Sequence, residues 1–248
     1  MKIYFIGVGE AFDENLFNTS ILVKTNINLL LDCGYAIPPL IWKHNPDQSF
    51  LDAIYISHLH SDHYFGLAAL MKRMVEEKRR KKLTLICQEK DKQTLVDVST
   101  LGHRGIFDNR FFPITLIGVR QERNITLGKM ELSFAQTKHS VSNLAIRIKY
   151  KDKVVCYSGD GDITLESRKL FRGTDLLIHE GYIFDAPTSL HTTMKKVVEM
   201  AIDNSIKTIA FTHVYRLERK KKISKLLAGL SKGKIKILIP KNGEYLEL

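Results

Sequence analysis

The feature that most restricts this fold is the segment HLHSDH at residues 58–63, because it places three imidazoles and a carboxylate within six positions. It directly follows the apolar run AIYIS at residues 53–57, whose β-branched and aromatic residues predict a short buried strand. His58 and His60 are expected to bind one metal ion where the strand opens into a loop. Asp62 and His63 can then face a second ion. The fold must therefore place the end of this strand at a metal site.

The ligand types indicate which metal such a site would hold. Imidazole nitrogen and carboxylate oxygen suit Zn²⁺ when no thiolate is near, and Mn²⁺ or Fe²⁺ can occupy the same kind of site. The three cysteines, Cys33, Cys87 and Cys156, are far apart and form no CxxC pair, so neither a cysteine zinc site nor a disulfide framework is indicated. Each is expected to be a small buried residue in a reducing compartment.

Length and composition predict one globular domain over residues 1–248. Of the 248 residues, 44% are hydrophobic and 26% are charged, which excludes a disordered chain, a coiled coil and a collagen-like repeat. The N-terminal residues lack the apolar stretch and cleavage site of a signal peptide, and no apolar run approaches the roughly 18 residues that span a bilayer. A cytoplasmic protein without a membrane segment is therefore expected.

The charge balance is strongly basic. The chain has 38 Lys and Arg against 27 Asp and Glu, a formal net charge of +11, which favours an anionic partner such as nucleic acid or a phosphate ester. Two basic runs, residues 78–82 and 219–222, carry part of this excess. Cations at the C-terminal end of a helix are favourable, so the first interpretation of each run is a solvated helix end. A phosphate contact is the alternative.

The hydrophobic pattern alternates between strands and helices. Strands are expected at residues 2–8, 20–24, 27–32, 83–87, 114–119, 130–137, 142–150, 153–158, 176–179 and 208–212, with further strands at the C-terminus. Helices are expected at residues 65–82, 90–101, 165–171, 192–204 and 218–230. A turn at residues 25–26 predicts a hairpin. Because helices follow strands along the chain, an α/β architecture with helices packed outside β-sheets is indicated.

The motifs taken together resemble the metallo-β-lactamase superfamily over essentially the whole chain. HLHSDH matches its HxHxDH signature, and four further pieces follow in the family's order. These are LLLDCG with Asp32, TKHSV with His139, YSGDGD with Asp160 and AFTHVYR with His213. The resemblance implies a four-layer αββα sandwich, in which two mixed β-sheets are flanked by helices.

The resemblance also implies the ligand set of a two-zinc centre. One ion would be bound by His58, His60 and His139, the other by Asp62, His63 and His213, with Asp160 bridging both and Asp32 supporting the site from behind. Two adjacent cations repel, so they need the bridging carboxylate and a bridging hydroxide, which is also the nucleophile. Asp62 would then be a catalytic residue too. Asp162 competes with Asp160 for the bridging role, but Asp160 comes directly after the predicted strand, and Asp162 is interpreted as a loop or cap residue.

One branch of the superfamily is favoured. His60 stands where the diiron flavoproteins carry glutamate, and the interval from Asp160 to His213 is too short for the extra domain of the mRNA-processing branch. The segments IHEG and LHTT resemble the paired HEAT and HST motifs of ribonuclease Z and its phosphodiesterase relatives. That resemblance implies that Glu180 orients His191, which protonates the leaving oxygen of a phosphodiester, as a histidine near its ordinary pKa can do.

Further assignments in this branch rest on weaker matches. Thr192, next to His191, and Arg216, in the VYR segment after His213, are candidates for substrate binding, the latter through a phosphate. His179 is interpreted as a buried structural histidine. Gly181 and Tyr182 replace the Ala-Thr of the HEAT motif.

The substrate stays open between two classes. Ribonuclease Z proteins commonly carry a long arm that grips tRNA, in bacteria between the third histidine and the bridging aspartate. Here only twenty residues separate His139 from Asp160, and two strands are expected to fill them. An RNA endonuclease, with tRNA 3′ processing as one role, is the first hypothesis. A small phosphodiester such as a cyclic nucleotide, or another ester, is the second, and a nucleic-acid-binding protein with an inactive site is the third. Ribonuclease Z relatives are often dimers, so a homodimer is also expected.

Overall fold

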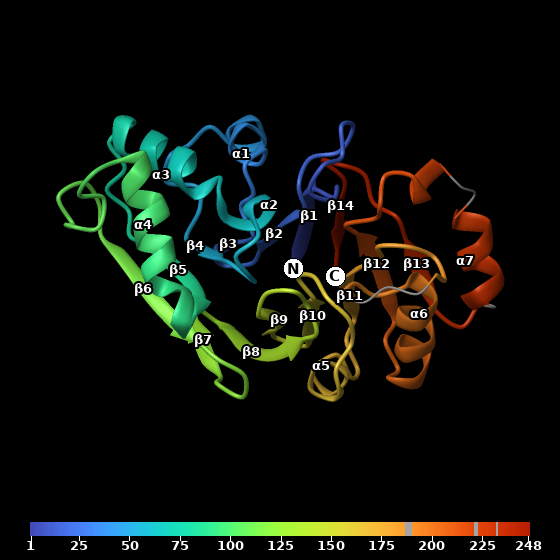
Figure 1. The fold of residues 1–248 in the computed structure, drawn as a ribbon. Helices are drawn as coiled ribbons and strands as arrows, with labels where there is room; N and C mark the ends of the chain where they lie inside the picture. The colour runs from blue at the N-terminus through green and yellow to red at the C-terminus, as the bar shows by residue number, and fades with distance from the viewer. Residues whose placement is uncertain (187–189, 221–222, 232) are drawn as a thin grey trace.

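The computed structural model describes residues 1–186, 190–220, 223–231 and 233–248. Two seven-stranded β-sheets face one another, and helices cover the outer side of each (Figure 1). This is the predicted four-layer αββα arrangement of two mixed sheets. None of the described helices is both long enough and apolar enough to cross a bilayer.

The first sheet is built mostly by the N-terminal half of the chain. Its strand order is β14 (Tyr245–Glu247), β1 (Lys2–Gly7), β2 (Ser20–Lys24), β3 (Asn28–Leu31), β4 (Ala53–Tyr55), β5 (Leu83–Gln88) and β6 (Ile114–Val119). Pairing is antiparallel from β14 to β3 and parallel from β3 to β6. The predicted hairpin at residues 25–26 is confirmed, since it joins β2 to β3.

The second sheet repeats this scheme. Its order is β7 (Ile125–Leu127), β8 (Met130–Thr137), β9 (Asn143–Tyr150), β10 (Lys153–Tyr157), β11 (Leu176–Glu180), β12 (Thr208–Thr212) and β13 (Lys236–Leu238). Pairing is again antiparallel over the first four strands and parallel over the last four. The two sheets therefore form a structural repeat, although the sequence shows no corresponding repeat.

The helices separate onto opposite sides of the molecule. The first sheet is covered by α3 (Leu67–Glu76) and α4 (Lys92–Gly102), with α1 (Pro38–His44) and the single turn α2 (Ser61–Tyr64) nearby. The second sheet is covered by α5 (Leu165–Leu170), α6 (Met194–Asp203) and α7 (Ile223–Ser231). In Figure 1, α3 and α4 lie on the left, whereas α6 and α7 lie on the right. Two 3₁₀ turns, η1 (Glu89–Asp91) and η2 (Glu218–Lys220), complete the described elements.

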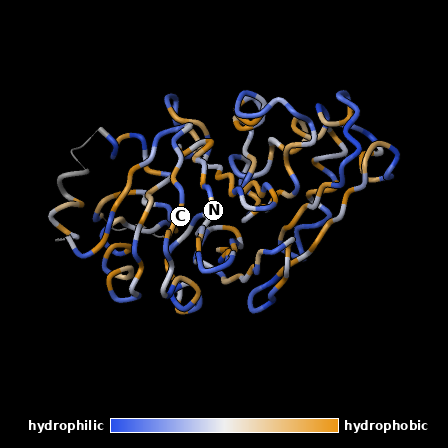
Figure 2. The backbone as a smooth tube through the Cα atoms, turned by 180° about the vertical axis from the view of Figure 1, so that it is seen from behind, coloured by the Kyte–Doolittle hydropathy of each residue, from blue (hydrophilic) through white to orange (hydrophobic). Residues whose placement is uncertain are grey.

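Three apolar clusters hold the layers together. The central one lies between the sheets and contains residues from both, such as Phe5, Tyr55, Leu144 and Tyr157. The other two lie under the helices of each sheet. Hydrophobic stretches follow the strands in Figure 2, whereas hydrophilic stretches follow the peripheral loops. Because parallel strands end at the same edge of their sheet, the loops after β3, β4, β10, β11 and β12 gather polar residues at one edge of the sandwich.

The helix predicted at residues 65–82 is shorter in the structure, because α3 ends at Glu76. The basic run at residues 78–82 therefore lies beyond the helix, and its interpretation as a helix end is wrong. Arg79 is only 1% exposed and donates hydrogen bonds to the backbone carbonyls of Gln48, Leu51, Lys81 and Lys82. Of the second basic run, residues 221–222 lie outside the described residues, while Arg219 pairs with Asp13.

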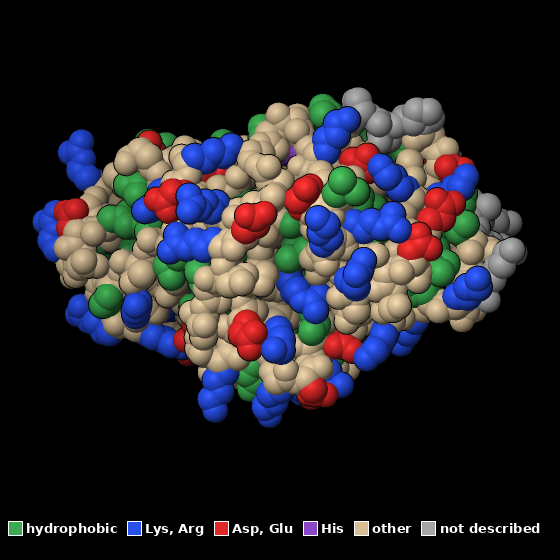
Figure 3. Space-filling view, turned by 90° about the horizontal axis from the view of Figure 1, so that it is seen from below, with side chains coloured by type: hydrophobic (Ala, Val, Ile, Leu, Met, Phe, Trp, Pro, Cys, Tyr) green, Lys and Arg blue, Asp and Glu red, His purple; other side chains and the backbone are tan. Residues whose placement is uncertain are grey.

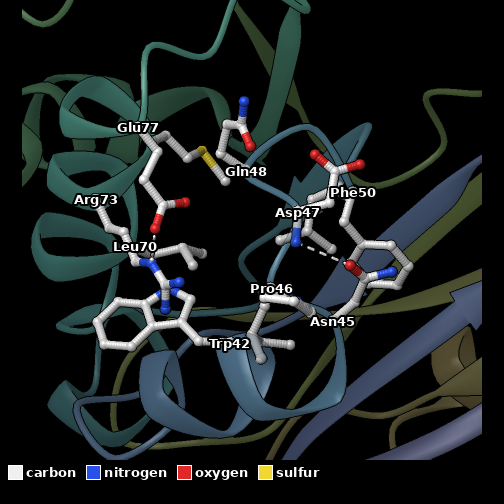
Figure 4. A pocket seen from close by; sticks show the side chains of 12 residues that line it. Trp42, Asn45, Pro46, Asp47, Gln48, Phe50, Leu70, Arg73 and Glu77 are labelled. Carbon is white, nitrogen blue, oxygen red and sulfur yellow. Dashed lines mark hydrogen bonds and ion pairs between the residues drawn. The ribbon is translucent and has the colours of Figure 1, made fainter.

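Three elements were not expected from the sequence, the short helices α1 and α2 and the strand β7. The chain between α1 and β4 packs against α3 around a cavity of about 20 Å³, room for about one water molecule. Figure 4 shows the guanidinium of Arg73 over the ring of Trp42, at 4.7 Å from its centroid, and bonded to Glu77. This cavity is too small for a ligand and belongs to the packing of the first sheet.

Candidate metal centre

The polar residues of the motifs converge at one edge of the sandwich. The chain leaves β4 as a loop and enters α2, and these residues supply His58, His60, Asp62 and His63. The segments after β8, β10 and β12 supply His139, Asp160 and His213. Every ligand implied by the resemblance lies in this one cluster.

The first group contains His58, His60, His139 and Asp160, whose nearest donor atoms all lie within 4.8 Å of one another. Nδ1 of His60 is 3.2 Å from Nε2 of His58 and 3.1 Å from Nε2 of His139. Oδ2 of Asp160 is 3.8 and 3.9 Å from the same two Nε2 atoms. Donors about 2.0–2.1 Å from a tetrahedral zinc ion lie roughly 3.4 Å apart, so these separations fit one ion.

The second group contains Asp62, His63 and His213. Oδ2 of Asp62 is 3.2 Å from Nε2 of His63 and 3.3 Å from Nε2 of His213. Oδ2 of Asp160 is also close to this group, at 3.5 Å from His63 and 3.3 Å from His213. One carboxylate oxygen therefore lies between both groups, which is the position that a bridging ligand needs.

Unsatisfied buried atoms support metal binding independently of the motifs. Among the described residues, Nε2 of His63 and Oδ1 of Asp160 are buried without a hydrogen-bond partner. Leaving such an atom unsatisfied costs about 1–3 kcal/mol, so their presence at the centre needs an explanation. A divalent cation in the second group would satisfy Nε2 of His63, and the donor set therefore fits the group that the fold implies.

The electrostatics of the two groups differ. Burial lowers the pKa of His58 well below its usual value, assisted by the neighbouring His63. Burial acts in the same direction on His63 and His213, but the carboxylates of Asp160 and Asp62 outweigh it. They raise the pKa of His63 well above its usual value and that of His213 to about 9. Before a cation binds, the second group therefore holds protons at neutral pH.

Asp32 lies behind the second group and holds it in place. Its Oδ2 accepts hydrogen bonds from Nδ1 of His63 at 2.8 Å and from the hydroxyls of Ser57 and Tyr157 at 2.7 Å each. Its Oδ1 accepts the backbone N–H of Ser57 at 2.7 Å. The carboxylate is fully buried, so these bonds fix the ring of His63 with Nε2 facing the centre. This is the position expected for Asp32 from the sequence.

The loop that carries Asp160 is fixed by side chains of the second sheet. The backbone carbonyl of Asp160 accepts from the amide of Asn143 at 2.8 Å and from the hydroxyl of Thr137. Its competitor Asp162 points elsewhere, because both of its carboxylate oxygens bond Nζ of Lys196 at 2.6–2.7 Å. The structure therefore places Asp160, not Asp162, among the donors.

Glu180 and His191 form a pair beside the metal ligands. Oε2 of Glu180 is 2.9 Å from Nδ1 of His191, and Oε1 accepts the backbone N–H groups of Gly161 and Thr192 at 2.8 and 3.1 Å. Burial, followed by the charge of Asp160, raises the pKa of Glu180 well above its usual value. Burial lowers the pKa of His191. Because Nδ1 of His191 faces Glu180, Nε2 lies on the opposite edge of the ring.

The weaker candidates lie around this pair in different roles. Thr192 is buried, and its backbone N–H supports Glu180. Arg216 pairs with Glu10, a carboxylate that is only 3% exposed, so a phosphate would have to compete with that partner. His179 is fully buried with Nδ1 bonded to the carbonyl of Glu180, and burial lowers its pKa to about 4. A neutral structural histidine is the interpretation that these contacts favour.

Sequence reasoning did not assign Ser57 and Tyr157, which hold Asp32, or Asn143, which holds the Asp160 loop. The sequence contains only a weak signal for Ser57 and Tyr157. Ser57 and Tyr157 are polar residues at the ends of apolar strands, where alternation alone predicts apolar side chains. Tyr182, which stacks on His191 with ring centroids 4.3 Å apart, was noted only as a departure from the HEAT motif.

Comparison with known sequences finds similarity to proteins named ribonuclease Z. A mitochondrial ribonuclease Z of Drosophila melanogaster is 28% identical over 86% of this chain, which spans 31% of that protein's length. Ribonuclease Z of Saccharolobus solfataricus is 23% identical over 86% of this chain and 88% of its own.

Comparison with solved structures confirms the fold. The metallo-β-lactamase fold protein YhfI from Bacillus subtilis superposes with a TM-score of 0.83, at 21% identity, over 99% of this chain and 98% of its own. The short form of human tRNase Z gives 0.81 at 17% identity over 100% and 99% of the two chains. A diphosphatase of the PhnP family gives 0.75 at 19% identity over 100% and 97%.

A family model matches far more of the chain than any single motif does. The model described as anti-Pycsar protein Apyc1 covers residues 1–229, which includes both ligand groups and the Glu180–His191 pair. Together with the two facing sheets, this match settles the membership. The chain has the metallo-β-lactamase fold, is ribonuclease Z-like, and belongs to the family of anti-Pycsar protein Apyc1.

Proposed function

We propose that this metal-dependent hydrolase cleaves a small phosphodiester, with a cyclic nucleotide as its substrate class, at a two-metal centre. The observation that carries the proposal is that Oδ2 of Asp160 lies between two complete ligand groups while the Glu180–His191 pair lies beside them. We propose zinc as the metal, because the donors are imidazole and carboxylate without thiolate.

The chain's own residues divide the reaction into two parts. When bound, two divalent cations would polarise the phosphoryl oxygens and supply a nucleophile at neutral pH. His58, His60 and His139 would hold one cation, Asp62, His63 and His213 the other, and Asp160 both. His191 would donate a proton from Nε2 to the departing oxygen, and Glu180 would keep the ring turned for that transfer. We propose Thr192 and Arg216 at the edge of the substrate site.

The short chain between His139 and Asp160 supports a small substrate. All of these residues are described, and β9, a two-residue turn and β10 fill them, so no arm projects from this place. A small phosphodiester needs no such arm. The family description names an anti-Pycsar protein, so we propose that counteracting Pycsar is the setting in which this hydrolysis acts.

RNA is the second candidate, because the curated relatives are named ribonuclease Z. In this reading the basic surface would replace the arm through contacts to phosphates. Figure 3 shows one face of the molecule, on which Lys and Arg are spread among Asp and Glu instead of forming one basic patch. The absence of an arm at residues 140–159 favours the small substrate.

One assay set separates the candidates. Zinc- or manganese-loaded protein is tested on bis-p-nitrophenyl phosphate, a panel of cyclic nucleotides and a 3′-extended precursor tRNA. Turnover of a cyclic nucleotide without cleavage of the tRNA is expected. Cleavage of the tRNA alone would replace the first candidate by the second, and turnover of no phosphodiester would exclude both.

Two variants test the roles of the residues. His191→Ala is expected to lower kcat about 100-fold or more while the protein keeps its metal, since a general acid contributes about 10²–10⁴-fold. Asp62→Ala is expected to lose metal from the second group and all turnover. His103→Ala, at the C-terminal end of α4, close to Lys72 and outside the ligand groups, is the matched control. Metal loss in His191→Ala would contradict the proton-donor role.

A further inference from the structure

We propose that Tyr182 is a positioning residue that holds the imidazole of His191 in the orientation for proton donation. The inference rests on the proposed function, in which His191 protonates the leaving oxygen. The inference gives a role to Tyr182, which stands where the HEAT motif has threonine.

The contact between the two rings is face to face. Their centroids are 4.3 Å apart and their planes differ by 16°, so the phenol covers one face of the imidazole. Among the described residues, the ring of His139 meets that of His191 edge-on at 5.0 Å, and the ring of His213 lies at 6.1 Å. Tyr182 makes the shortest of these ring contacts with His191.

The stacked ring acts together with the Glu180 hydrogen bond. Small coupled changes of χ1 and χ2 can tilt the imidazole while Nδ1 stays near Oε2 of Glu180, and such a tilt moves Nε2 away from the leaving oxygen. A flat ring stacked on one face opposes this tilt. Small misplacement of a catalytic group is expensive, because proton transfer requires hydrogen-bond distance to the reacting atom.

The backbone of Tyr182 is anchored to the segments that carry both histidines. Its carbonyl accepts the N–H of Tyr215, two residues after His213. The next residue, Ile183, accepts the N–H of Met194 and pairs with Thr193, two residues after His191. Tyr182 therefore connects the metal-ligand loop with the loop of the proton donor.

Further side chains pack beside Tyr182. The ring of Tyr215 lies 5.2 Å away, tilted by 30°, and the guanidinium of Arg216 lies over Tyr215 at 5.2 Å. Arg216 in turn pairs with the buried carboxylate of Glu10. These contacts restrict the movement of the phenol.

The test compares Tyr182→Leu with Tyr182→Phe on aryl phosphodiesters of graded leaving-group basicity. Phenolate is a poor leaving group that needs the proton, whereas p-nitrophenolate leaves without it. For Tyr182→Leu we expect kcat to fall about tenfold or more on diphenyl phosphate and less than about twofold on bis-p-nitrophenyl phosphate. Tyr182→Phe keeps the flat ring and is expected to stay within about twofold of wild type on both.

A matched control shows whether loss of any stacked tyrosine has this effect. Tyr245→Leu removes a ring that stacks on Tyr4 at 5.4 Å, at the β1–β14 edge. It is expected to leave both rates unchanged. An equal loss on both esters in Tyr182→Leu, or no recovery in Tyr182→Phe, would overturn the positioning role.

A second readout needs no turnover, so failure of the proposed function can be told apart from failure of this inference. In zinc-loaded protein the Nδ1 proton of His191, bonded to Glu180, is expected to give a downfield NMR resonance in wild type and Tyr182→Phe. In Tyr182→Leu the resonance is expected to disappear through exchange with water. A resonance that persists in Tyr182→Leu would overturn the inference, whether or not the wild type cleaves a phosphodiester.

Discussion

Four imidazoles of the centre, those of His58, His60, His63 and His139, use one nitrogen for the protein and leave the other for the donor cluster. His58 and His63 are held through Nδ1 by Ser57 and Asp32, and His139 through Nδ1 by the carbonyl of Leu190. His60 is reversed, since its Nε2 contacts Ser140 and its Nδ1 faces the centre. Outer partners of this kind set both the tautomer and the orientation of a ligand.

Asp32→Asn tests that support at a single residue. The amide keeps the shape of the carboxylate but presents N–H to groups that already donate, so the ring of His63 loses its fixed position. Zinc affinity of the second group is expected to fall about 10–100-fold, measured by competition with a chromophoric chelator. Asp175→Asn is the control, because Asp175 is also a buried carboxylate, bonded to Val154 and Lys207 far from the centre. Equal affinities in both variants would contradict this prediction.

Protons on His63 and His213 should make metal binding depend on pH. Both groups have a raised pKa before a cation binds, that of His213 reaching about 9. A cation binds only the deprotonated imidazole, so at pH 7 filling the second group is expected to release about two protons from these rings. Affinity should therefore rise with pH and level off above about pH 9 as His213 loses its proton beforehand. Calorimetric titration in buffers of different ionisation enthalpy counts the protons, and a count near zero would contradict the raised pKa values.

At the scale of elements, the sequence predicted those whose pattern is local. Strands β2, β6, β8 and β12 have the expected bounds, because each is an apolar run between turn residues. The strand β7 has three residues and is defined by its pairing with β8, and α1 has seven with no side-chain cap, so neither has a local signal of its own. Likewise the metal ligands are local motifs, whereas Tyr182 acquires its contact with His191 only when two loops meet in the folded chain.

The turn after α3 shows the same limit of local reasoning and gives a stability prediction. Arg79 is buried and satisfies four carbonyls of two loops, whereas its neighbour Arg80 is exposed. Arg79→Ala is expected to lower the free energy of unfolding by about 3 kcal/mol, because buried carbonyls lose a charged donor. Arg80→Ala is expected to change it by less than about 0.5 kcal/mol. Urea denaturation measures both, and similar values for the two variants would show that Arg79 does not hold the loops together.

At the scale of the whole molecule, the repeated sheet topology explains where the centre lies. In each sheet three parallel pairings follow three antiparallel ones, and the loops after the parallel strands of both sheets meet at one edge. Asp32 and the HxHxDH loop come from the first sheet, Asp160, Glu180 and His213 from the second. Separating the sheets would therefore divide both ligand groups. That residues 1–248 form one domain, and that the chain forms a homodimer, stay predictions.

The net charge of +11 gives a test of substrate class that involves the whole surface. A single-stranded RNA that contacts about five phosphates loses roughly 100-fold in affinity between 50 and 200 mM salt, because bound cations are released. A substrate with one negative charge loses only about threefold over the same range. Because a cyclic nucleotide carries one negative charge, its kcat/KM is expected to fall by no more than about threefold. A steep loss of kcat/KM with salt for the cyclic nucleotide would contradict this prediction, because it would mean that several dispersed cations act on one small anion at the centre. RNA cleavage whose kcat/KM falls about 100-fold over the same salt range would indicate a continuous phosphate-binding path and favour the endonuclease.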